Sequence, residues 1–209
     1  MKTMVAMPCM DQIQTETVQC LLHMKQVGDV RFDLLSCSLV YKSRTDLGLL
    51  ALKEKQDFVL WIDSDMVFPP HLMEDLIADM EGRDIVAGVC HMRRAPFRPV
   101  IYKTLRQGLT PAENESAHYD DYPDEIFEAE GVGFGCVMMR TSVIQDVVDR
   151  YHELFSPLPG YGEDLSFCIR ARSCGHKIHV DPNIQVGHKA STIVTNKTFE
   201  AYRDGHAIE

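Results

Sequence analysis

The first 90 residues alternate short apolar runs with stretches whose apolar residues recur at helical spacing. The apolar runs lie at residues 3–7, 31–40, 57–62 and 84–89, and the helical stretches at residues 11–26, 46–55 and 69–80. Because residues 58–62 are all apolar, that run is typical of a strand buried on both faces. Repeated strand–helix–strand units imply right-handed crossovers and a mainly parallel sheet. The sequence therefore predicts an α/β fold with helices on both sides of a central sheet.

The second half of the chain has a different pattern. We expect an edge strand at 97–102, two short strands interrupted by glycines at 126–140, helices at 142–154 and 163–173, and short strands at 177–180 and 184–186. Residues 110–125 are polar and acidic, which indicates a solvated loop or, alternatively, a mobile flap. The weakly patterned tail at 190–209 is expected to be partly disordered or to act as a lid. Since no repeat or second boundary is visible, residues 1–209 are predicted to form a single domain.

The composition limits the partners of the chain. A net charge of -10 argues against a broad nucleic-acid-binding face. An anionic ligand would need local neutralisation in so acidic a chain, and a divalent cation held by carboxylates is one way to supply it. The seven cysteines include no Cys-x-x-Cys pair, which predicts reduced, mostly buried thiols rather than a zinc site.

No targeting or membrane-spanning segment is predicted. The apolar stretch at the N-terminus is too short for a secretion signal. No apolar run reaches the roughly 18 residues that a bilayer-spanning helix needs. We therefore expect a cytoplasmic protein without a transmembrane helix.

Two aspartates, Asp63 and Asp65, directly follow the buried run at 57–62. In open parallel sheets, ligands bind beyond the carboxyl ends of the strands. Residues two apart in an extended chain point to the same side, so both carboxylates can converge on one hard cation such as Mg²⁺ or Mn²⁺. That cation would bridge diphosphate oxygens and neutralise the charge on a leaving group. The alternative is helix capping ahead of Pro69.

A second acidic pair, Glu163 and Asp164, lies where the helix at 163–173 is expected to begin. Acidic residues are favourable at a helix N-terminus, so capping alone could explain the pair. The functional interpretation is that one of the two acids is a general base that removes a proton from an attacking hydroxyl.

Basic and imidazole groups supply further candidates. His188 follows a short strand near the C-terminus, and neutral imidazole is a frequent ligand of Mn²⁺-class metals. A hydrogen-bonded surface histidine is the alternative. Arg44, with Lys42 and Ser43, lies at a helix start where basic and backbone N–H groups could contact phosphate. The basic stretch that contains His91, Arg93, Arg94 and Arg98 could face a diphosphate or an anionic acceptor, or it could form an exposed turn.

Three glycines alternate along the chain at Gly131, Gly133 and Gly135. They lack the order of a Rossmann fingerprint and the Lys-Ser/Thr of a P-loop. We expect them to let the backbone approach a sugar closely.

Asp63-Ser64-Asp65, Glu163-Asp164 and His188, in this order, resemble the motifs of GT-A glycosyltransferases, in particular the family 2-like group. The resemblance covers nearly the whole chain, from the opening strand and Pro8 to His188. It implies a Rossmann-like GT-A fold in which Asp65 binds a metal directly, while Asp63 contacts the ribose or reaches the metal through water. It also implies that His188 is a late metal ligand and that Asp164 is a better base candidate than Glu163. Donor contacts are implied for Pro8, Arg44, Asp63, Ser64, Asp65, Gly133 and Gly135.

The resemblance further implies a metal-dependent hexosyltransferase that uses Mn²⁺ or Mg²⁺ and inverts the anomeric carbon. A UDP-sugar is the first expectation for the donor and a GDP-sugar the second; the acceptor is an unknown hydroxyl. The chain lacks a long C-terminal acceptor region, so a homo-oligomer is one way to complete the site. The alternative is a retaining enzyme of the same fold.

Two rival functions also stay open. A nucleotidyltransferase would also use an α/β sheet and carboxylate-bound metal. It usually carries a glycine-rich signature with Arg and Lys after the first strand, which residues 7–11 lack. The second rival is a catalytically silent nucleotide-sugar-binding module.

Overall fold

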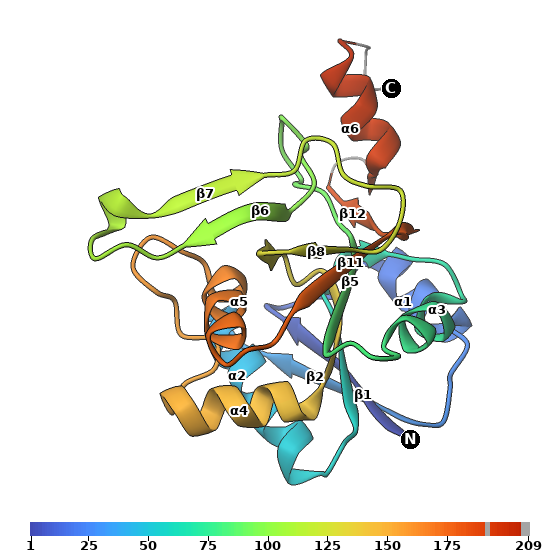
Figure 1. The fold of residues 1–209 in the computed structure, drawn as a ribbon. Helices are drawn as coiled ribbons and strands as arrows, with labels where there is room; N and C mark the ends of the chain where they lie inside the picture. Colours follow the sequence, from blue (N-terminus) through green and yellow to red (C-terminus); the bar gives the residue numbers. More distant parts are fainter. Residues whose placement is uncertain (191–192, 206–209) are drawn as a thin grey trace.

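The centre of the protein is a seven-stranded mixed sheet with a mainly parallel core (Figure 1). The structure, a computed structural model, describes residues 1–190 and 193–205. The strand order is β2 (Asp29–Ser36), β1 (Lys2–Cys9), β3 (Phe58–Ile62), β10 (Cys136–Arg140), β5 (Ile85–Val89), β11 (Ile178–Gln185) and β8 (Phe127–Ala129). β1 is parallel to β2 and β3, and β11 is parallel to β5, while β10 and β8 run antiparallel to their neighbours. The predicted α/β fold is therefore confirmed.

Helices cover both faces of this sheet (Figure 1). One face packs against α2 (Val40–Lys53), α4 (Thr141–Tyr151) and α5 (Glu163–Ser173), and the other against α1 (Thr15–His23) and α3 (Leu72–Asp79). The side chains of β3 alternate between the two cores: Val59 and Trp61 lie in the first, and Leu60 and Ile62 in the second. All four are fully buried. The apolar run thus folds as its composition predicts, as a strand covered on both sides.

Two small sheets lie beside the main one (Figure 1). One contains β6 (Ile101–Arg106), β7 (Glu115–His118) and β9 (Gly131–Val132). The other contains β4 (Met66–Val67), β12 (Gly187–Lys189) and β13 (Ile193–Val194). In the second of these sheets His188 pairs with Met66. This register brings the end of the chain back to the turn that carries Asp63 and Asp65.

Several expected helix boundaries shift in the structure. The helix expected at 11–26 is shorter, Thr15–His23, and the helix expected at 46–55 begins earlier, at Val40. The early start of α2 was missed because Ser43 and Arg44 are polar but buried, which breaks the apolar spacing. The weakly patterned tail includes β13 and a helix, α6 (Asn196–Arg203), with a capping box at Thr195. The remainder of that predicted tail, 191–192 and 206–209, lies outside the described residues.

Strand boundaries shift as well. The edge strand expected at 97–102 begins only at Ile101, because residues 91–99 form a closed loop. The polar segment at 110–125 is not only loop, since it contains a short 3₁₀ helix (Pro111–Glu113) and β7. Residues 126–140 hold three strands instead of two. The strands expected at 177–180 and 184–186 are one strand, β11, with an irregularity between Asp181 and Gln185.

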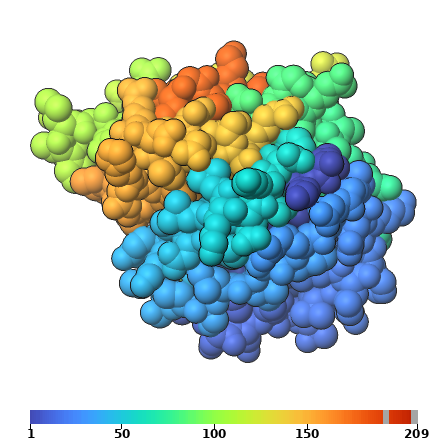
Figure 2. All heavy atoms as spheres, turned by 90° about the horizontal axis from the view of Figure 1, so that it is seen from below, coloured from blue at the N-terminus to red at the C-terminus, as the bar shows by residue number. Residues whose placement is uncertain are grey.

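Seen from below, the first half of the chain occupies the lower part of the view and the second half much of the upper part, with the residues near 105–115 projecting at one side (Figure 2). All seven cysteines are free thiols, as predicted. Among the described residues, no helix combines the length and apolar character that crossing a bilayer requires.

Candidate functional site

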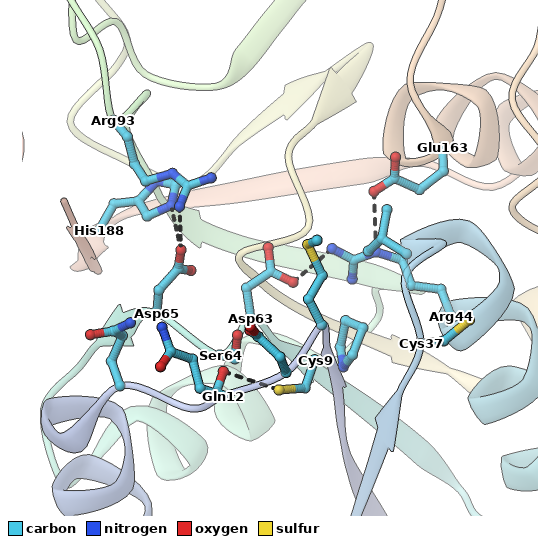
Figure 3. A pocket seen from close by; sticks show the side chains of 15 residues that line it. Cys9, Gln12, Cys37, Arg44, Asp63, Ser64, Asp65, Arg93, Glu163 and His188 are labelled. Atoms are coloured by element: carbon cyan, nitrogen blue, oxygen red, sulfur yellow. Dashed lines mark hydrogen bonds and ion pairs between the residues drawn. The ribbon is translucent and has the colours of Figure 1, made fainter.

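A pocket of 380 Å³ opens at the carboxyl ends of β1 and β3 (Figure 3). Seven of the residues predicted for the site line it: Pro8, Arg44, Asp63, Ser64, Asp65, Glu163 and His188. They come from β1, α2, the turn after β3, the start of α5 and β12. The structure thus brings together side chains from positions up to 180 residues apart along the sequence, at the edge where open parallel sheets bind ligands.

Asp63 is held in position by one backbone hydrogen bond and one side-chain hydrogen bond. Its backbone N–H donates to the carbonyl of Gly135 at 3.3 Å, and its Oδ1 accepts from Arg44 Nη2 at 2.7 Å. Burial raises the pKa of Asp63, the Arg44 guanidinium opposes that rise, and the neighbouring charge of Asp65 adds to it. Arg44 is therefore the main group that favours the ionised form of Asp63 against burial.

Arg44 links the two acidic motifs. Its side chain is only 3% exposed, and its Nε lies 3.4 Å from Oε1 of Glu163. The guanidinium also lies over the ring of Phe134, 5.3 Å from the ring centroid. A buried arginine needs compensating charge, which Asp63 and Glu163 supply. Arg44 therefore fixes the relative position of the aspartates after β3 and the acidic pair at the start of α5.

Asp65 faces a different set of partners. Its Oδ2 lies 2.9 Å from Arg93 Nη1 and 3.4 Å from His188 Nε2. Burial pushes the pKa of Asp65 upward, but His188 and Arg93 together outweigh it, and the pKa is lowered. His188 Nδ1 lies 2.7 Å from the carbonyl oxygen of His91. Because a carbonyl can only accept, Nδ1 carries a proton and Nε2 is turned toward Asp65 (Figure 3).

These residues fit a divalent cation that is shared with a ligand. Over the described residues, no group of three or more His, Cys, Asp or Glu side chains could hold a metal on its own. Asp65 and His188 nevertheless offer an oxygen and a nitrogen donor side by side, with Asp63 beside them. The bond from His188 Nδ1 to a backbone carbonyl is the usual support of a metal-binding histidine. In nucleotide-binding proteins, Mg²⁺ is typically held by only one or two protein side chains, and phosphate oxygens of the nucleotide supply further ligands.

Asp164, the expected general base, lies behind this pocket and does not line it. Its Oδ1 accepts from the N–H of Leu165, the next residue in the first turn of α5, at 2.7 Å. Burial, and after it the charge of Glu163, raise the pKa of Asp164 to about 6. Such a carboxyl is mostly ionised at neutral pH, yet it accepts a proton more readily than an ordinary aspartate.

The glycines that were expected to approach a sugar have a packing reason in this structure. A Cβ at Gly133 would lie 2.8 Å from Val100 Cγ1, and one at Gly135 would lie 2.9 Å from Met66 Cε. Neither residue lines the pocket. Their contact with a donor stays a prediction, but side-chain packing already requires glycine there.

The structure adds residues that the sequence did not single out. The end of β1 and the loop after it contribute Cys9, Met10, Asp11, Gln12 and Gln14, and the segment from the end of β2 to the start of α2 contributes Cys37 and Val40. Their position just after two adjacent parallel strands is the signal that could have found them. Of the basic stretch, Arg93 reaches the site, while Arg98 pairs instead with Asp120 at 2.9 Å.

Comparison with known proteins gives a fold match without a sequence match. No protein-family model matches the chain, and no curated protein matches it. Among solved structures, A197 from STIV has a TM-score of 0.62 at 17% identity, covering 91% of this chain and 86% of A197. S. aureus TarS 1-349 has a TM-score of 0.51 at 16% identity, covering 86% of this chain and 58% of that one. GalNAc-T7, crystallised with UDP, GalNAc and Mn²⁺, has a TM-score of 0.57 at 10% identity, covering 97% and 47%.

The fold is that of the GT-A nucleotide-sugar transferases. Glycosyltransferases are among the structures similar to this chain. The chain spans 58% of the TarS fragment and 47% of the GalNAc-T7 chain, so it corresponds to about half of each. At these identities the likeness establishes the fold, and the chemistry has to be argued from the pocket.

Proposed function

We propose that the protein is a metal-dependent glycosyltransferase that transfers a sugar from a nucleoside diphosphate to an acceptor hydroxyl. The observation that carries this proposal is the meeting of Asp63, Asp65 and His188 in one pocket at the carboxyl ends of the strands of a GT-A fold. A UDP-sugar is the first candidate for the donor and a GDP-sugar the second. The presence of UDP, GalNAc and Mn²⁺ in the GalNAc-T7 crystal supports this choice of donor class and metal.

In this proposal Asp65 and His188 hold a Mn²⁺ or Mg²⁺ ion, and Asp63 contacts it through water or binds the ribose. When bound, the ion would neutralise charge on the departing diphosphate. Pro8, Arg44 and Ser64 line the same pocket and are proposed to contact the nucleotide. Arg44 Nη2 lies 2.7 Å from Asp63 Oδ1 and holds that carboxyl in position beside the pocket.

Asp164 is proposed to act as the base. An acceptor hydroxyl would attack the anomeric carbon from the side opposite the diphosphate, and its proton would pass to the Asp164 carboxylate. Inversion at the anomeric carbon follows from this geometry of attack. Glu163 contributes through its ion pair with Arg44 and by raising the pKa of Asp164. The cytoplasmic location and a homo-oligomeric state stay predictions.

The experiment that tests the function is a thermal-shift screen of nucleoside diphosphates with and without Mn²⁺, followed by transfer assays with sugars of the nucleotide that binds. A ligand selective for the native state raises Tm, by an amount that grows with its concentration relative to Kd. We expect UDP to raise Tm only when Mn²⁺ is present. Release of pyrophosphate from a nucleoside triphosphate would instead indicate a nucleotidyltransferase, and binding without any turnover a silent module.

A further inference from the structure

The loop between β5 and β6 is fixed at its base and carries exposed arginines beyond it. His91 and Pro99 form an isolated bridge, and the N–H of Met92 donates to the carbonyl of Arg98 at 2.9 Å. His91 is fully buried, with its ring 5.6 Å from that of Phe199 in α6. The Arg93 side chain, in contrast, is 57% exposed. The base of the loop is thus anchored, while, within the described part of the chain, the Arg93 guanidinium is held only by its contact with Asp65 and is otherwise exposed to solvent.

Each aspartate of the pair after β3 has its own arginine, and the two arginines differ in burial. Arg44, on Asp63, is 3% exposed and is enclosed by aromatic rings. Arg93, on Asp65, is 57% exposed. Removing Arg44 from its carboxylate would strand a buried charge, whereas Arg93 can leave Asp65 and be solvated by water. Of these two ion pairs, only the one between Arg93 and Asp65 can therefore be broken at low cost, so that another cation can take the place of the arginine.

The contact of Arg93 is made on the oxygen that a cation would use. Arg93 Nη1 lies 2.9 Å from Asp65 Oδ2, and His188 Nε2 lies 3.4 Å from the same atom. A guanidinium and a divalent cation compete for that oxygen, because the two positive charges repel each other when both are in contact with it. Arg93 also lines a neighbouring open hollow of 690 Å³ with Met92, Arg94 and Ala95, so the side chain has room to move away.

We propose that Arg93 holds the place of the divalent cation on Asp65 and moves to the donor's diphosphate when cation and donor bind. The inference rests on the proposed function, because it takes the cation site and the diphosphate donor from it. Guanidinium binds phosphate oxygens well, often through two N–H groups. The exchange makes binding of the two ligands cooperative. The cation frees Arg93 for the donor, and the donor removes Arg93 from the cation site, with equal coupling in both directions.

The test compares Arg93→Gln with Arg94→Gln. Arg94 follows Arg93 in the sequence, carries the same charge and is also exposed. Unlike the Arg93 guanidinium, that of Arg94 makes no ion pair or hydrogen bond among the described residues. Mn²⁺ binding to the nucleotide-free full chain is measured from the electron paramagnetic resonance of free Mn²⁺. UDP binding at saturating Mn²⁺ is measured by calorimetry. We expect Arg93→Gln to bind Mn²⁺ about three- to tenfold more tightly and UDP more weakly by a similar factor. Arg94→Gln should match the unmodified protein in both measurements.

The exchange is overturned if Arg93→Gln binds Mn²⁺ no more tightly than the unmodified protein and Arg94→Gln. If Asp65→Asn abolishes Mn²⁺ binding while Arg93→Gln has no effect, the cation site stands and only the role of Arg93 fails. If Mn²⁺ affinity survives Asp65→Asn, or no variant binds Mn²⁺, the cation site itself is wrong and the exchange falls with it.

Discussion

At the scale of single residues, the site is a set of carboxylates whose protonation is set by neighbours. Burial raises the pKa of Asp63, while basic groups lower that of Asp65 although burial opposes them. Burial also raises the pKa of Asp164, to about 6, and Arg44 only partly offsets that rise. The three aspartates thus differ in pKa because of where they lie.

The pH dependence of transfer follows from Asp164. A base must be ionised to accept a proton, so a base whose pKa is about 6 loses activity as pH falls below 6 and keeps it above. Asp164→Asn should lower kcat by roughly 10²- to 10⁴-fold, the usual contribution of general-base catalysis, and should leave donor affinity unchanged. Steady-state kinetics between pH 5 and 8 with about one-unit steps measure both effects.

The matched control is Asp149→Asn, an exposed aspartate on α4 that lies away from the pocket. It should keep the activity and pH profile of the unmodified protein. Full transfer by Asp164→Asn would remove this residue as the base.

Arg44 is expected to matter for stability as well as for the site. Arg44→Met would leave the carboxylates of Asp63 and Glu163 without the guanidinium that both of them contact. Breaking a buried ion pair by removing one partner costs about 3–5 kcal/mol, and we expect the lower end because Asp63 and Glu163 are 29% and 19% exposed. Urea denaturation at pH 8 measures the change in the free energy of unfolding.

Arg44→Lys is the companion variant, since it keeps the charge but not the planar fork. It should recover much of the stability while still weakening donor binding. An unchanged free energy of unfolding in Arg44→Met would show that the buried arginine does not hold the two acidic motifs together.

At the scale of secondary-structure elements, prediction succeeded where the signal was local. The run at β3 and the bounds of α5, Glu163–Ser173, could be read directly from apolar spacing and the acidic start. The start of α2 could not be predicted in this way. Arg44 is a charged residue whose burial depends on an ion pair with Asp63, 19 residues away, so it does not fit the apolar spacing of a helix. The strand β7 was missed because Glu115–His118 is polar and largely exposed, so its partner β6 decides its conformation.

The same distinction applies to the site. Asp63 and Asp65 were found because they follow a strand that is easy to recognise. The contact between Arg93 and Asp65 was beyond sequence reasoning, since it depends on how the 91–99 loop closes. The pairing of His188 with Met66 likewise comes from the register of a small sheet whose strands are only two or three residues long.

An acidic pair between α3 and β11 gives a stability prediction at this scale. Asp79 lies against Asp181, and burial, together with that neighbour, raises the pKa of Asp79 to about 7. The folded state therefore holds a proton that the unfolded chain releases near pH 4, so stability falls as pH rises from about 4 to 7. Above pH 7 Asp79 loses this proton, and the charge that it gains is repelled by Asp181.

Asp79→Asn removes this repulsion. We expect its Tm to exceed that of the unmodified protein by about 2–4 °C at pH 8, which corresponds to roughly 1 kcal/mol for a chain of this size. The gain should shrink as pH is lowered toward 5. Differential scanning calorimetry at both pH values checks it, and a Tm difference independent of pH would contradict the shared proton.

At the scale of the whole molecule, the fold gathers distant segments at one edge of the sheet. The chain places Pro8, Asp63 and His188 around a single pocket, although they are far apart in sequence. The final segment returns through β12 and then covers the 91–99 loop with α6, where Phe199 packs against His91 and Tyr202 against Phe97. The site is therefore a property of the complete arrangement and not of any one motif.

The most direct test of the central claim is a crystal of the protein grown with UDP and Mn²⁺, measured at a wavelength where manganese scatters anomalously. The proposal predicts one strong anomalous peak in contact with Asp65 and His188, with diphosphate oxygens completing its ligands and Arg93 turned away from Asp65. A crystal that binds UDP but shows no peak there, with Asp65 still paired to Arg93, would contradict it.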